Sequence, residues 1–169
     1  KPGMVVGDIV NGRKVSLGPS NDQKIITYVL WLAIQQNLLS NTDIITSNLD
    51  YVFLKSAGSI ENLNTNTSLV IEPLISTSKE SMLIERYKMQ FRADPEQLLK
   101  DFESQDKSYI IGARIKGELD SAFTLEDIKK IELDTKQHIN DIKEANIILF
   151  ADTDLLSDNT WISEQDMFG

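Results

Sequence analysis

Cysteine is absent from the 169 residues of the chain, and histidine occurs once, at His138. The absence of cysteine excludes disulfides, thiolate nucleophiles, zinc ribbons and iron–sulfur sites. A single histidine excludes multi-histidine metal sites, and a serine–histidine triad would have to use His138. Because His138 lies in a polar, helix-like stretch and no nucleophile-elbow motif accompanies it, we interpret it as a solvated surface residue.

Basic residues and long hydrophobic runs are also scarce. Lysine and arginine number 17 against 26 aspartates and glutamates, so the net charge is −9. An acidic chain repels phosphate backbones, and nucleic acid is therefore not expected as a partner. The most apolar run, residues 25–34, has about half the length that a membrane-spanning helix needs. Glycine-rich phosphate loops are missing, which indicates that this segment is not itself an ATPase.

The length and ends of the chain bear on its domain organisation. A chain of 169 residues fits one domain, and its ordinary composition is typical of a soluble globular protein. It opens with Lys1 and Pro2 rather than methionine, and no signal peptide follows. We therefore expect a single domain over residues 1–169, or the downstream part of a larger one, as an excised or processed segment.

Hydrophobic patterning predicts several strands. Asn11-Gly12 suits the positive-φ positions of a tight turn, so we expect a hairpin between residues 5–10 and 15–17. Further strands are expected over residues 25–34, 51–54, 68–75, 109–115 and 146–151. The strand over residues 25–34 could instead pass into a helix near Trp31. The strand over residues 68–75 is expected to be interrupted at Pro73.

Three segments carry helix signals. Ser78 is a plausible N-cap for a helix over residues 78–91, and Asp94 with Pro95 is a stronger helix start. Residues 124–142 show isoleucines spaced by three or four, which predicts one or two amphipathic helices. Since strands and helices alternate, the expected fold class is α/β, a layered sandwich whose mixed, mostly parallel sheet is flanked by helices.

Three carboxylates follow the last predicted strand, at Asp152, Asp154 and Asp158. Hard cations prefer such oxygen ligands, which makes these residues the candidate metal ligands. Ser157 stands where an EF-hand needs glycine, so that motif is excluded. The Asp-x-Asp also resembles the nucleophile strand of haloacid-dehalogenase-type phosphatases, but the downstream lysine of those enzymes is missing. Because Asp and Ser are ordinary N-caps, we favour a capping role and assign no catalytic residue, cofactor or metal.

An ordered series of segments resembles a known protein family. The series comprises residues 28–35, 42–49, 56–58, 72–78 and the strand that ends in residues 152–158. It resembles the extracytoplasmic region of auxiliary (GldG-like) components of uncharacterised and gliding-motility ABC-type transport systems. The resemblance extends from Val5 to Trp161. The positions that match the family pattern are Pro73, Ser78, Asp152, Asp154 and Asp158.

The resemblance implies a non-catalytic role. It places the domain on the periplasmic side of the bacterial inner membrane, beside separate permease and ATPase subunits, with membrane segments that are absent from this chain. Two rival functions stay open. One is a metal-dependent phosphohydrolase with Asp152 as nucleophile and Asp154 as acid/base. The other is a binding module for a sugar or lipid headgroup that stacks on Trp31 or Trp161.

Overall fold

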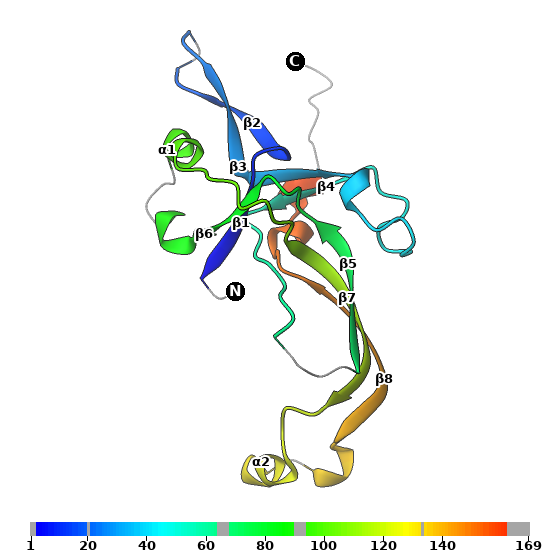
Figure 1. Ribbon diagram of the computed structural model, residues 1–169. Helices are drawn as coiled ribbons and strands as arrows, with labels where there is room; N and C mark the ends of the chain where they lie inside the picture. The colour runs from blue at the N-terminus through cyan, green and yellow to red at the C-terminus, as the bar shows by residue number, and fades with distance from the viewer. Residues whose placement is uncertain (1–2, 20, 64–67, 90–93, 133, 162–169) are drawn as a thin grey trace, which may run out of the picture. The chain divides into compact units, whose positions relative to one another are not determined.

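The computed structural model describes residues 3–19, 21–63, 68–89, 94–132 and 134–161, apart from the side chains of Asn159 and Trp161 (Figure 1). The chain divides into two compact units. The first comprises Lys1–Glu61, Pro73–Ala113 and Phe150–Gly169, and the second comprises Asn62–Glu72 and Arg114–Leu149.

Strands dominate the described residues. They are β1 (Met4–Asp8), β2 (Gly12–Leu17), β3 (Lys24–Gln35), β4 (Tyr51–Lys55), β5 (Leu69–Ser76), β6 (Ser81–Glu85), β7 (Ile110–Asp120) and β8 (Asp141–Phe150). The α-helices are α1 (Pro95–Lys100), α2 (Leu125–Lys130) and α3 (Asp158–Trp161), and the 3₁₀ helices are η1 (Gln36–Leu38), η2 (Arg86–Met89), η3 (Thr135–Gln137) and η4 (Asp154–Leu156). The strands form three sheets, in the orders β1-β6, β2-β3-β4 and β5-β7-β8.

The predicted fold class is wrong. The sheets are mostly antiparallel rather than mostly parallel, and β1 pairs with β6, β2 with β3 and β3 with β4 in antiparallel register. Parallel neighbours need a crossover of a dozen or more residues, usually a helix. Neither α1 nor α2 exceeds six residues, which is too short to cover a sheet in that way. Among the described residues, no helix is both long and apolar enough to span a membrane.

The strands predicted over residues 25–34, 51–54, 68–75, 109–115 and 146–151 are confirmed as β3, β4, β5, β7 and β8. Two details differ. β3 stays extended through Trp31 to Gln35. β5 continues past Pro73 to Ser76, because it lies at the edge of its sheet, where a proline without an N–H can be accommodated.

The predicted hairpin at Asn11-Gly12 and the predicted helix over residues 78–91 are both wrong, and one buried carboxylate accounts for much of the difference. Asp8 is fully buried. It accepts hydrogen bonds from the backbone N–H of Val10 at 2.9 Å and Asn11 at 3.0 Å, and from Asn11 Nδ2 at 2.8 Å. Ser78 donates two more, from N at 2.7 Å and Oγ at 2.9 Å. Ser78 is thereby held against Asp8 instead of capping a helix, and β6 follows and pairs with β1.

The helix signal over residues 124–142 is only partly confirmed. Thr124 caps α2 in a reciprocal capping box with Asp127, as its sequence favours. The helix ends at Lys130, with Ile131 as its C-cap, and Glu132 adopts a φ of +58°, which an α-helix does not tolerate. Residues beyond this point form η3 and then β8, so the isoleucine spacing at the two ends belongs to different elements.

The core of the first unit contains two clusters of buried side chains. One draws on β3, β4, β5 and β7 and consists of Leu32, Ile34, Leu39, Val52, Leu54, Ala57, Leu74, Ile75 and Ile111. The other joins β1, β3 and β6 to α1 through Val5, Val29, Leu30, Ile84 and Leu98. Leu32 and Ile34 of the first cluster alternate along β3 with the more exposed Trp31, Ala33 and Gln35, so one side of this part of the strand is left toward solvent.

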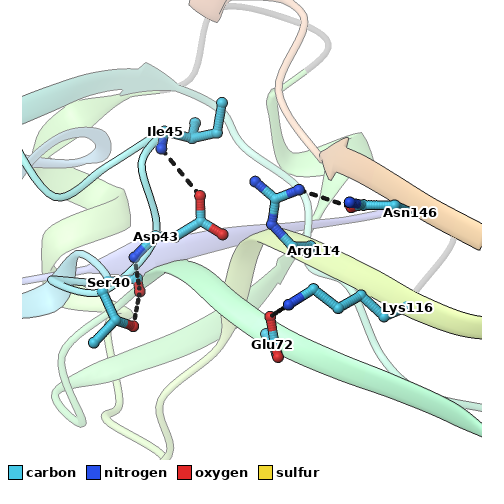
Figure 2. Close-up of polar contacts among 8 residues, drawn as sticks. Ser40, Asp43, Ile45, Glu72, Arg114, Lys116 and Asn146 are labelled. Carbon is cyan, nitrogen blue, oxygen red and sulfur yellow. Dashed lines mark hydrogen bonds and ion pairs between the residues drawn. The ribbon is translucent and has the colours of Figure 1, made fainter.

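The second unit is held by polar contacts between neighbouring strands (Figure 2). Lys116 Nζ pairs with Glu72 Oε2 at 2.8 Å, and Arg114 Nη1 donates to Asn146 Oδ1 at 2.7 Å. Gly117 adopts a φ of +129°, and a Cβ added there would collide with the backbone carbonyl oxygen of Ser68. The close approach of these two strands therefore requires glycine at this position.

Replacement of Gly117 by alanine is expected to destabilise the second unit by about 1–3 kcal/mol, because both the φ angle and the space are unfavourable. The measurement is amide hydrogen exchange of β7 in the wild-type and variant chains. Gly3→Ala is the matched control, since Gly3 also has a positive φ, of +72°, but a Cβ there meets no atom within 4 Å. Equal effects of the two substitutions would contradict the role assigned to the Ser68 carbonyl.

Candidate functional site

Asp152, the first of the three candidate carboxylates, lies in the turn that follows β8. Its Oδ2 accepts a hydrogen bond from the backbone N–H of Lys55 at 2.9 Å. Its Oδ1 accepts from the backbone N–H of Asp154 at 2.7 Å and of Leu155 at 3.2 Å. The carboxylate therefore joins β4 to the first turn of η4, and this geometry supports the capping interpretation.

Asp152 is half-buried, and this burial raises the pKa of its carboxyl above the ordinary value. The three backbone N–H donors lower the pKa, and the nearby charge of Asp154 raises it further, so the net direction is upward. A raised pKa means that the folded chain retains a proton that the unfolded chain has already lost. Through this group alone, stability falls as the pH rises from about 3.9, the usual aspartate value, to the folded pKa.

The pKa of Asp127 is shifted in the opposite direction to that of Asp152. Hydrogen bonds from the side chain and backbone of Thr124 lower the pKa of Asp127, so its contribution to stability is present above the ordinary pKa and is lost as the pH falls. In an NMR titration of the side-chain carboxyl carbons, we expect Asp152 to titrate above Asp127. The reverse order would contradict the burial of Asp152.

Asp154 and Asp158 are both exposed and begin η4 and α3, respectively. The side chain of Asp152 bonds to the backbone of Asp154 rather than converging with its carboxylate. Within the described ranges, no group of three acidic or histidine side chains is placed to hold a metal ion.

His138 follows η3, and it is less exposed to solvent than the surface position that the sequence predicted. Its side chain is only partly exposed, and Nε2 is buried without a hydrogen-bond partner among the described residues. Trp161, the second tryptophan, ends α3, and its side chain lies outside the described part.

Trp31, by contrast, belongs to a group of aromatic and cationic side chains on the outer side of the β2-β3-β4 sheet. In register, Trp31 is opposite Lys55, Ala33 opposite Phe53, and Gln35 opposite Tyr51. The alternate residues of these strands form the core. We call this group the aromatic face and define it by Arg13, Tyr28, Trp31, Tyr51, Phe53 and Lys55. Tyr28 stands at its border, where it contacts Trp31 and also packs against the second core cluster.

The rings and cations of the aromatic face contact one another. Tyr28 meets Trp31 edge-on, with ring centroids 5.3 Å apart at 70°, and the centroids of Tyr51 and Phe53 lie 4.8 Å apart. Arg13 Cζ lies 4.6 Å above the Phe53 ring, and Lys55 Nζ lies 5.7 Å from the Trp31 ring. These are cation–π distances.

The position of Arg13 depends on a small residue in the central strand. Arg13 extends from β2 and Phe53 from β4, on the two sides of β3, so the arginine side chain crosses β3 to reach the ring. The β3 residue opposite Phe53 is Ala33, whose short side chain leaves room for this crossing. No carboxylate pairs with the side chain of Arg13 or Lys55 in the part of the chain that the structure describes.

The sequence singled out Trp31 but missed the residues around it, because they come from three strands. Two signals were available. Tyr51, Phe53 and Lys55 alternate with the buried Val52 and Leu54, a period of two that is typical of a strand with one exposed side. Whether these side chains lie next to Trp31 and Arg13 depends on the register between the strands, and the sequence of one strand does not determine that register.

Comparison with known proteins gives one match. No curated protein and no solved structure matches the chain significantly. Over residues 1–169, however, the sequence matches the protein family described as ABC-type uncharacterized transport system. This match confirms the resemblance at the level of the family, whereas the GldG-like and gliding-motility assignments stay predictions. The chain is therefore a member of this family of auxiliary proteins of ABC-type transport systems.

Proposed function

We propose that this chain is a non-catalytic, extracytoplasmic domain of an auxiliary transporter subunit, which acts through contacts with partner proteins or with cargo. The observation that carries the proposal is the family match over residues 1–169. The hydrogen bonds of Asp152 also support it, because they give the carboxylate a structural role between β4 and the first turn of η4.

The proposed partners are the permease and ATPase subunits of the same transport system. ATP would be used by the ATPase, and its free energy would reach this domain through conformational change. Such coupling requires that the domain bind two states of its partner with different affinity, since equal affinity shifts no equilibrium. The proposed location is the periplasmic side of the inner membrane, with anchoring by other segments of the parent protein.

Co-purification of the full-length parent protein tests the proposal. After gentle detergent extraction, we expect a permease and an ATPase to be recovered in stoichiometric amounts. A variant of the parent that lacks residues 1–169 of the present numbering serves as the control for contacts made elsewhere in the protein. Loss of both subunits from the complete parent protein would contradict the proposal.

A further inference from the structure

We propose that the aromatic face binds an acidic glycan, a polysaccharide segment that carries uronate carboxylates. The face gathers four of the aromatic side chains of a chain that has only 2 Trp, 4 Tyr and 6 Phe. Trp31 is 38% exposed and Tyr51 is 48% exposed, so ring surface is accessible to a ligand. This binding site does not depend on the transporter role proposed above.

The rings supply the contact for the sugar rings. The face of an aromatic ring is negative and its edge positive. The C–H groups on one side of a pyranose carry partial positive charge and pack against such a face. The sugar hydroxyls then point sideways into water, so stacking does not require their desolvation. The two exposed rings, Trp31 on β3 and Tyr51 on β4, are offset by four register positions, about 13 Å along the strands, so they provide platforms for two separate sugar units of one oligosaccharide.

The cations supply the selectivity for acidic sugars. The chain has a net charge of −9, yet this face presents Arg13 and Lys55, and no carboxylate of the described residues pairs with their side chains. A guanidinium that is stacked on a ring keeps its in-plane N–H groups available for a bidentate carboxylate. The contact of Arg13 Cζ with the Phe53 ring, 4.6 Å from its centroid, keeps the guanidinium on the aromatic face, where it can meet a uronate.

The position of the face on the sheet favours a glycan over a peptide. β3 is the central strand of its sheet: β4 pairs with Trp31–Gln35, and β2 pairs with Lys24–Tyr28 and with Leu32. Trp31 therefore lies on the face of a central strand rather than at a free edge. An extended peptide binds to a sheet by adding a strand at a free edge, and on this face its own N–H and C=O groups would lose water without finding partners. Two cations are also too few for tight binding to a nucleic acid, whose affinity comes from many phosphate contacts.

Tryptophan fluorescence tests the proposal on the 169-residue chain. Trp161→Phe leaves Trp31 as the sole tryptophan, and this background is titrated with oligogalacturonate and with maltooligosaccharide of equal length. We expect saturable quenching by oligogalacturonate, at least about tenfold weaker binding of the neutral sugar, and weaker binding at high salt. Isothermal titration calorimetry measures the same binding in variants that lack Trp31.

Substitutions on and off the face then locate the site. Trp31→Ala and Arg13→Gln are each expected to weaken oligogalacturonate binding about tenfold. Ile44→Ala and Lys129→Gln are the matched controls, because both residues are exposed and lie outside the face, and they are expected to leave binding unchanged. Circular dichroism of each variant confirms folding.

Several outcomes would overturn the proposal. They are an absence of quenching by oligogalacturonate, equal binding of the neutral sugar, or unchanged affinity in folded Trp31→Ala and Arg13→Gln chains. Equal or tighter binding of poly-glutamate would assign the face to an acidic protein segment. Equal or tighter binding of phosphatidylserine vesicles would assign it to a membrane surface.

Discussion

Replacement of Asp8 by alanine is expected to lower the free energy of unfolding by about 3–5 kcal/mol, because buried donors lose a charged acceptor. Asp8 is 0% exposed and accepts five hydrogen bonds, from Val10, Asn11 and Ser78. Its removal leaves the backbone N–H groups of Asn11 and Ser78 without an acceptor and opens a cavity. For a chain of this length, the midpoint of thermal unfolding should fall by about 10 °C.

The matched control is Asp22→Ala. Asp22 is exposed in the loop between β2 and β3, and its substitution should change stability by less than about 0.5 kcal/mol. Calorimetry or urea denaturation measures both variants. Asp8→Asn refines the test, because asparagine keeps the shape but replaces one acceptor oxygen with a donor that faces other donors. If Asp8→Ala unfolds at the temperature of the control, the carboxylate does not organise the turns around it.

Asp152→Ala is expected to destabilise the chain by about 2–3 kcal/mol, since three backbone N–H groups lose their acceptor. Two of them, at Asp154 and Leu155, lie in the first turn of η4, and the third belongs to Lys55 in β4. Asp152→Asn should recover part of this loss, because its remaining oxygen can still accept from the turn. Urea denaturation of the three proteins gives the differences.

Asp154→Ala separates the capping role from catalysis. The Asp154 side chain is exposed at the start of η4, so its removal should leave stability nearly unchanged. The phosphohydrolase alternative makes a different prediction, namely that a generic phosphate ester is hydrolysed in the presence of Mg²⁺ and that either Asp152→Asn or Asp154→Ala abolishes the hydrolysis. Activity that exceeds the blank and disappears in these variants would establish the alternative and refute the non-catalytic role.

The local sequence was sufficient for individual strands and helix starts. The apolar runs of β3 and β8 and the Asp94-Pro95 start of α1 follow from neighbouring residues alone. The sheet arrangement did not follow, because pairing depends on contacts between distant residues. Ser78 illustrates this limit, since it is a reasonable N-cap by residue type, but its backbone N–H and its hydroxyl both donate to Asp8, 70 residues earlier.

In the candidate site, too, contacts between sequence neighbours were predictable and contacts between distant residues were not. Asp152 was identifiable as a cap because its partners at Asp154 and Leu155 are close in the sequence, whereas its bond to Lys55 spans 97 residues. On the aromatic face, Trp31 was identifiable, but Arg13 and Phe53 meet only because β2 and β4 lie on the two sides of β3. Side chains that converge from separate strands leave no local pattern.

The pairing of β1 with β6 also affects how the nascent chain folds on the ribosome. Met4 pairs with Glu85 and Asp8 with Ser81, so β1 emerges before its partner strand and cannot pair until β6 has also been synthesised. At a synthesis rate of about 5–20 residues per second, this delay lasts several seconds. During that time Val5 and Val6, which are buried in the finished fold, are exposed in the nascent chain. The first unit is therefore completed well after β1 is synthesised, and chaperones have time to bind β1 before β6 covers it.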